Sequence, residues 1–208
     1  MNSVTGINGL YRGLLYVAVG WLLTAAVAGL GKTLGITVML PATSAALLIH
    51  MVFRAGPEGH PLEAAPLPAD LAAALALGYL EDLHQGLPTG TLTLAYGLTL
   101  LAMRWADGRL SIRGPIGRAA MALVACALID LITWAVLLSL SGPLGLPPGV
   151  LDAGLATMHW HALATMLATP AIWAIIDGAL RLSLRVSRLL QRPSAPVQRI
   201  AGRRPPPS

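Results

Sequence analysis

Six apolar stretches, separated by short polar or turn-rich segments, follow one another along most of the chain. About 17–25 helical residues are needed to cross the roughly 30 Å hydrocarbon core of a bilayer. The expected spans are 14–31, 36–53, 67–85, 90–106, 119–141 and 153–180. The third is the weakest, because it is alanine-rich and ends at Glu81, so a re-entrant or tilted segment is its alternative. The pattern predicts an all-α, polytopic integral membrane bundle of about six transmembrane helices.

Composition supports a membrane protein. Hydrophobic residues make up 55% of the chain and charged residues 11%, with a mean hydropathy of +0.69. Soluble domains carry about 25% charged residues, so this chain has too few charges to cover a water-exposed surface.

The cations predict an orientation for this bundle. With six spans and a cytoplasmic amino terminus, every Lys and Arg of the fourteen except Lys32 falls on the cytoplasmic side. This is the asymmetry of the positive-inside rule, so we expect both termini in the cytoplasm.

The first span has two interpretations. Arg12, an apolar run and the small residues Ala26 and Ala28 are also typical of a cleaved signal peptide. The small-residue ladder Gly20, Thr24 and Ala28 instead favours a retained helix that packs closely against a neighbour.

Three helix breakers separate the third span from the fourth. Gly86, Pro88 and Gly90 fall within five residues and predict a tight hairpin, whose threonines can cap the following helix. Immediately before them stand Glu81, Asp82 and His84. We expect Glu81 and His84 to meet water at the outer membrane boundary and Asp82 to be held by protein.

These three side chains are also the best candidates for chemistry. Glu81 and His84 lie three residues apart on one helix face, which can hold a proton or a divalent ion. No second cluster completes a catalytic set, and neither a nucleophile motif nor a nucleotide fingerprint is present. We therefore expect no enzyme activity, no cofactor and no nucleic-acid partner.

Asp130 lies near the middle of the fifth span and must face protein, because a charge in lipid is costly. A hydrogen bond to Thr99 or Tyr96 of the fourth span, or a proton or ion site, would explain it. Asp177 precedes Arg181 by four residues, so an ion pair within the helix is expected.

His159 and His161 diverge by about 200° on a helix and do not share a metal ion unless the helix unwinds. No cluster of Cys or further His completes a site with them, so no metal site is expected, and with Trp160 they fit an interfacial belt. Cys126 is the only cysteine and excludes an intramolecular disulfide.

A basic stripe follows the last span. Its members recur at helical spacing and predict an amphipathic helix attracted to anionic lipid of the inner leaflet. They are Arg181, Arg185, Arg188 and Arg192. Residues 1–192 are thus expected to form one transmembrane domain, and residues 193–208 a disordered, basic, proline-rich tail.

The segment GYLEDLHQGLPTGTLTLAY resembles a characteristic segment of the bacterial rod-shape-determining protein MreD family. About twenty residues match closely, and size, span number and basic terminus match loosely. His84, Glu81 and a longer loop before the third span depart from the family pattern. The matching positions are Asp82, Gly86, Pro88, Gly90, Leu94 and Tyr96.

The resemblance implies a non-enzymatic scaffold of the cell-elongation complex in the bacterial plasma (inner) membrane. Such a protein would pair with the single-span protein MreC and connect the MreB filament to peptidoglycan synthesis by a penicillin-binding transpeptidase and RodA. Asp82 and the hairpin would shape a packed element. The small-residue first span and the face around Tyr96 would be partner surfaces.

Six-span proteins of this size also serve as substrate-binding subunits of vitamin uptake transporters. In that case Asp130, Tyr96, Glu81 and His159 would line a ligand cavity. We favour the scaffold, because the hairpin segment matches position by position and nothing in the sequence specifies a ligand.

Overall fold

The computed structural model describes residues 3–35, 40–53, 67–107, 109–110, 114–145 and 149–190. Within these ranges all regular secondary structure is helical, which confirms the all-α part of the predicted fold. The six helices are α1 (Ser3–Leu34), α2 (Thr43–Val52), α3 (Leu67–Gln85), α4 (Thr91–Asp107), α5 (Pro115–Leu144) and α6 (Val150–Leu190).

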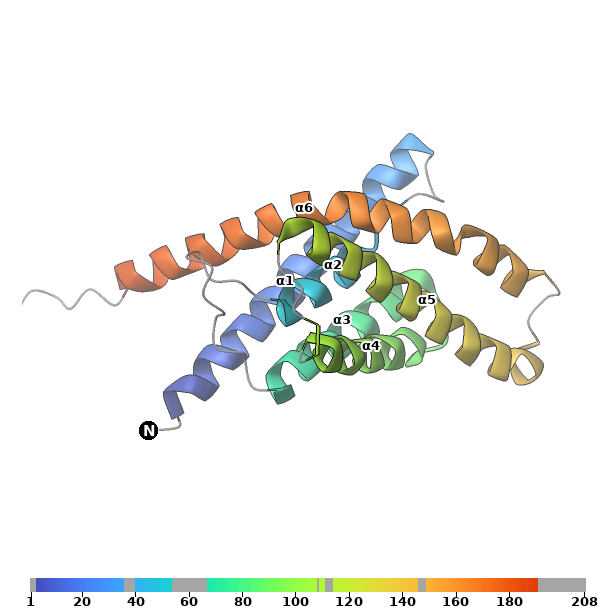
Figure 1. The fold of residues 1–208 in the computed structure, drawn as a ribbon, viewed down its shortest axis with the longest axis horizontal. Coiled ribbons are helices and arrows are strands. Elements are labelled where there is room, and N and C mark those ends of the chain that lie inside the picture. The colour runs from blue at the N-terminus through green and yellow to red at the C-terminus, as the bar shows by residue number, and fades with distance from the viewer. Residues whose placement is uncertain are drawn as a thin grey trace, which may run out of the picture.

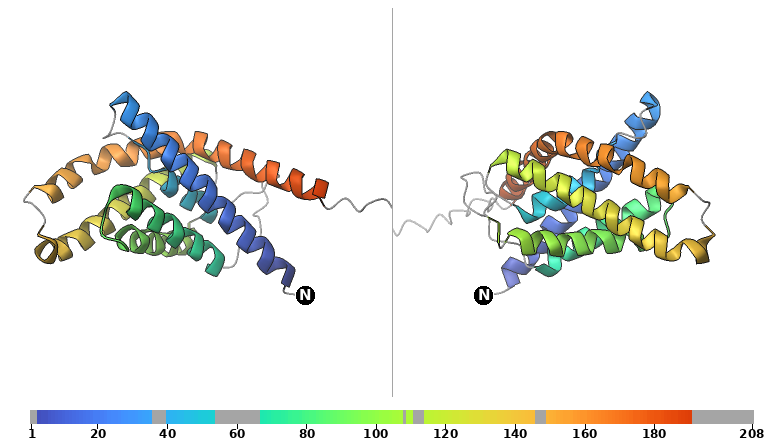
Figure 2. Two further views of the ribbon diagram at one scale, coloured as in Figure 1. Left: turned by 180° about the vertical axis from the view of Figure 1, so that it is seen from behind. Right: turned by 45° about the vertical axis from the view of Figure 1, so that its right-hand side comes forward.

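Successive helices alternate in direction, so the amino ends of α1, α3 and α5 and the carboxyl ends of α2, α4 and α6 lie on one side (Figures 1 and 2). Arg104 in the last turn of α4 and Arg118 in the first turn of α5 therefore belong to the same end of the bundle. Lys32, in the last turn of α1, belongs to the opposite end. These three cations are divided between the two ends as the charge pattern predicts, and the alternation of the helices puts the start of α1 and the end of α6 on the same side.

Among the described residues, three helices are long and apolar enough to cross a membrane, and they indicate a membrane protein. These segments are Tyr11–Leu34, Pro115–Leu144 and Leu151–Ser183. Large apolar side chains also point outward from the bundle, among them Leu22, Ile116 and Leu167, which is 75% exposed. Exposed apolar surface of this extent is suited to contact with lipid or a partner protein.

Helix α2 is much shorter than the expected span 36–53. Its ten residues rise about 15 Å, half of the hydrocarbon thickness, and residues 40–42 before it are not helical. Pro41 explains the late start, because proline lacks an amide hydrogen and disfavours helical geometry in the residue before it. Residues 36–39 lie outside the described ranges.

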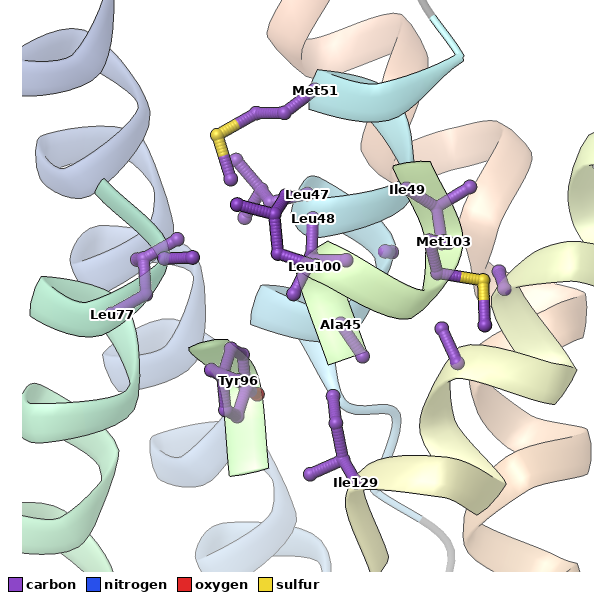
Figure 3. Close-up of a cluster of buried hydrophobic side chains, with 14 of the residues drawn as sticks. Ala45, Leu47, Leu48, Ile49, Met51, Leu77, Tyr96, Leu100, Met103 and Ile129 are labelled. Carbon is purple, nitrogen blue, oxygen red and sulfur yellow. The ribbon is translucent and has the colours of Figure 1, made fainter. Parts of the chain in front are cut away.

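The short helix α2 occupies the centre of the bundle. Every residue from Thr43 to Ile49 is buried, and the neighbouring helices supply the side chains around it. Figure 3 shows Leu47, Leu48 and Ile49 of α2 among buried residues of α3, α4 and α5. The backbone of α2 also accepts a hydrogen bond from α6, because the Trp173 indole donates to the Ala46 carbonyl oxygen at 2.9 Å.

Helix α6 continues beyond the expected span 153–180 and carries the first part of the basic stripe. Arg181 and Arg185 are exposed on it, and Arg188 follows in the same helix. Arg192 and the expected tail 193–208 lie outside the described residues.

Candidate functional site

Asp82 joins the end of α3 to the start of α4. Its carboxylate is 1% exposed and accepts four hydrogen bonds across the turn. The main-chain amides of Gly90, Leu92 and Thr93 donate at 2.9, 2.8 and 3.2 Å, and the Thr93 hydroxyl donates at 2.9 Å. A helix begins with unpaired amides and a partial positive charge, and both favour a carboxylate. Asp82 is therefore the cap of the next helix, and protein holds it as expected.

Glycine is required at three places in this hairpin. Gly86 and Gly90 have φ of +66° and +101°, which residues with a Cβ rarely adopt. Gly78 lies where α3 meets the first turn of α4, and a Cβ there would come within 2.7 Å of the Leu92 carbonyl oxygen. Pro88 completes the turn by accepting hydrogen bonds from the amide and hydroxyl of Thr91 at 3.1 and 2.8 Å.

Glu81 and Tyr96 form a buried pair between α3 and α4. The Tyr96 hydroxyl donates to the Glu81 carboxylate at 2.8 Å, and their exposed fractions are 0% and 7%. Ser44, at the start of α2, lies beside Glu81 and lines the same small pocket. The expectation that Glu81 meets water is therefore wrong, because the central helix α2 covers this face of α3. The prediction that Tyr96 belongs to a partner surface is also wrong, because its side chain is fully buried.

His84 does not join the acids. It is exposed, and its Nδ1 lies 2.8 Å from the Leu80 carbonyl oxygen of its own helix. Glu81 faces α2, and Asp82 faces the start of α4. Asp82 thus faces away from the other two side chains, whereas Glu81 and His84 both line the small pocket against α1 and α2 and make no hydrogen bond to each other.

Asp130 pairs with His161 of α6 rather than with α4. Its carboxylate oxygens lie 3.3 and 3.2 Å from His161 Nδ1, and Cys126 Sγ lies 3.8 Å from both the Asp130 Oδ2 atom and His161 Nδ1. The expected bond to Thr99 or Tyr96 is wrong, since Tyr96 is engaged with Glu81. Cys126, Asp130 and His161 offer three ligand atoms within 4.8 Å of one another.

A cavity of about 380 Å³ lies beside this cluster, between α5 and the first half of α6. Asp130 and His161 contribute to its wall, and Gln85 at the end of α3 reaches it. His159 is exposed and lies outside the lining. The other lining residues are Thr133, Trp134, Leu137, Leu151, Gly154, Leu155, Thr157 and Met158.

Asp177 also has a partner other than the expected one. Its carboxylate lies 3.1 Å from His50 Nε2, and His50 Nδ1 lies 2.9 Å from the Tyr16 hydroxyl. The expected pairing with Arg181 is thus replaced by a link between α1, α2 and α6. Sequence spacing favoured the residue four positions away, whereas the fold brings α2 closer.

The cluster of Cys126, Asp130 and His161 was not anticipated as a unit. Its sequence signal was the spacing of Cys126 and Asp130, four residues apart on one face of a helix. His161 belongs to another helix, and only the packing of α5 against α6 brings it there. The chain matches no protein-family model, no curated protein and no solved structure.

Proposed function

We propose that the protein is a non-enzymatic membrane scaffold of the MreD type in the bacterial plasma membrane. It pairs with an MreC-like single-span protein and connects an MreB-like filament with a penicillin-binding transpeptidase and RodA. It crosses the bilayer six times with both termini in the cytoplasm, and α2 with residues 40–42 before it provides the second, incompletely helical pass.

The observation that carries this proposal is the set of hydrogen bonds that Asp82 accepts. Asp82, an acid of the segment that resembles the family, accepts four hydrogen bonds from Gly90, Leu92 and Thr93. The residues that carry the resemblance therefore build a rigid hairpin, and a scaffold needs such a fixed shape more than it needs a reactive group.

The second half of α1 is the partner surface in this proposal. Gly20 and Thr24 pack inside the bundle, where Thr24 Oγ1 lies 2.8 Å from Thr43 Oγ1. Ala25, Ala28 and Gly29 are exposed on the same helix. Small exposed residues let another membrane helix approach closely, which suits a single-span partner.

Photocrosslinking in cells tests this assignment. A photoreactive residue at Ala25 or Ala28 is expected to capture the MreC-like protein of the same cell, identified by mass spectrometry. Leu167, 75% exposed on α6, is the matched control and should capture lipid only. Capture of the same protein from all three positions, or from none in correctly inserted protein, would count against the scaffold.

The cavity between α5 and α6 favours a second candidate, a substrate-binding subunit of a vitamin-type uptake transporter. Its volume of about 380 Å³ is within the range of small-molecule pockets. Only Asp130 of the expected ligand residues lines it, because Tyr96 and Glu81 are committed to each other. Co-purification with transporter ATPase subunits, and a thermal shift with a vitamin that Trp134→Ala removes, would favour this candidate over the scaffold.

A further inference from the structure

We propose that Cys126, Asp130 and His161 form a binding site for one divalent transition-metal ion, with Zn²⁺ as the best match. Thiolate, carboxylate and imidazole are the three side-chain ligands that zinc uses in proteins. Cys126 and Asp130 lie one turn apart on α5, and α6 brings His161 against them. The site lies outside the hairpin on which the scaffold proposal rests.

The triangle of ligand atoms has the size that a tetrahedral ion requires. Zinc bonds of about 2.3 Å to sulfur and about 2.0–2.1 Å to nitrogen or oxygen give tetrahedral edges of about 3.5 Å from sulfur and about 3.3 Å between nitrogen and oxygen. The corresponding distances are 3.8 Å from Cys126 Sγ to each partner and 3.2 Å from His161 Nδ1 to Asp130 Oδ2. Shifts of a few tenths of an ångström would complete three bonds.

The alternative is a set of hydrogen bonds in which Cys126 stays a thiol. A thiol is a weak donor, and sulfur contacts of 3.8 Å are at the long end of what its hydrogen bonds span. A metal ion explains why one sulfur lies equally far from two strong ligands. It also adds positive charge beside the Asp130 and His161 pair, in an apolar helix where a carboxylate is costly.

Asp130 and His161 both line the cavity, so an open coordination position of the ion would be reached from there. Three protein ligands with one open position are typical of zinc sites that exchange a water or small ligand. Among the described residues, the Thr133 hydroxyl and the Trp134 indole nitrogen are buried beside this cavity without a hydrogen-bond partner. A water or small anion on the ion would give them one.

Thr165 contacts two of the three proposed ligand residues. Its hydroxyl lies 3.5 Å from Cys126 Sγ, donates to the His161 carbonyl oxygen at 2.8 Å and accepts from the Ala42 amide at 2.8 Å. Such outer contacts orient ligands, and their loss typically costs about 10–100-fold in metal affinity. Through Ala42 the site is also joined to the start of the central helix α2.

Cobalt substitution tests the site in the full-length protein. The chain is purified in detergent with an affinity tag that lacks histidine, and one equivalent of Co²⁺ is added. Because Cys126 is the only cysteine, a thiolate-to-cobalt charge-transfer band arises from this residue alone. We expect that band together with the visible bands of tetrahedral Co²⁺, and their replacement by equimolar Zn²⁺ but not by Mg²⁺.

Variants locate the binding site. Cys126→Ser, Asp130→Asn and His161→Gln should each abolish stoichiometric zinc binding, and Thr165→Ala should raise the Kd about tenfold. His159→Gln, exposed on the same helix as His161, is the control and should bind as the parent chain does. Each variant is first checked for a monodisperse elution profile.

Two results would overturn the proposal. One is a wild-type cobalt spectrum without the thiolate band, which decides the question even if every variant misfolds. The other is stoichiometric zinc retained by folded Cys126→Ser, Asp130→Asn or His161→Gln protein.

Discussion

The Asp82 carboxylate and the Leu92 amide, ten residues apart in the chain, are joined by a hydrogen bond of 2.8 Å. The acid belongs to the last turns of α3, and the amide belongs to the first turn of α4. A helix therefore receives its amino-terminal cap from the helix before it. The geometry of the turn is held at both ends by one side chain.

Asp82→Ala is expected to destabilise the protein strongly. It removes the acceptor for three main-chain amides, and each buried donor left unpaired costs about 1–3 kcal/mol. Asp82→Asn keeps one oxygen acceptor and should fall between the alanine variant and the parent chain. Unfolding by increasing SDS in mixed micelles, followed by circular dichroism, measures the loss.

Asp107→Ala is the control for this series, because Asp107 is exposed at the last residue of α4. It should change the free energy of unfolding by less than about 0.5 kcal/mol, as is usual for surface substitutions. Equal stability of the Asp82 and Asp107 alanine variants would contradict the capping role.

Gly78→Ala is expected to separate α3 from α4. The new Cβ would lie 2.7 Å from the Leu92 carbonyl oxygen and from Thr93 Cα, both of them backbone atoms that cannot rotate away. Overpacking of this kind typically costs about 1–3 kcal/mol. Gly178→Ala is the matched control, because its Cβ would meet nothing within 4 Å and alanine is the better helix former. The midpoint of thermal unfolding should thus be lower than that of the parent chain for Gly78→Ala and higher for Gly178→Ala.

Tyr96→Phe is expected to lower the stability of the fold clearly, and Glu81→Gln is expected to lower it only slightly. The phenylalanine removes the hydroxyl that donates to Glu81 and leaves one hydrogen bond of a buried carboxylate unmade, at a cost of about 1–3 kcal/mol. Glutamine has nearly the same shape and still accepts through its amide oxygen. The unfolding midpoints of the two variants provide the measurement. A larger loss for Glu81→Gln would mean that its negative charge has a role beyond packing.

The ion pair of Arg104 with Asp70 is expected to behave as a coupled unit. It joins the carboxyl end of α4 to the first turn of α3, and Asp70 keeps only 3% of its side-chain surface exposed. Removing one partner from a buried pair typically costs about 3–5 kcal/mol, and removing both costs less than the sum. A double-mutant cycle of Asp70→Leu and Arg104→Leu measures the coupling, and strictly additive losses would count against it.

The sequence was most informative where structure depends on neighbouring residues. The turn at Gly86, Pro88 and Gly90 appears between α3 and α4 as expected, because breakers act locally. Helices occupy all six expected regions, since apolar periodicity and length are also local properties. Pro41 was the residue from which the late start of α2 could have been predicted. The prediction of a span at 36–53 followed the continuous hydropathy instead.

Pairings between distant segments were predicted poorly. Asp130 was expected to bond to α4, and Asp177 to a residue of its own helix. Their partners are His161 and His50, which lie 31 and 127 residues away. Which face of a helix meets which neighbour depends on the packing of the whole bundle, and no spacing rule in one chain carries that information.

The burial of α2 has a consequence for the biogenesis of the protein. A ten-residue helix does not stably enter a bilayer alone, and its amide at Ala42 and carbonyl at Ala46 find their side-chain partners in Thr165 and Trp173 of α6. These residues leave the ribosome more than a hundred positions later. The amino-terminal half therefore lacks these two hydrogen-bond partners of α2 until α6 has been translated and packs against it.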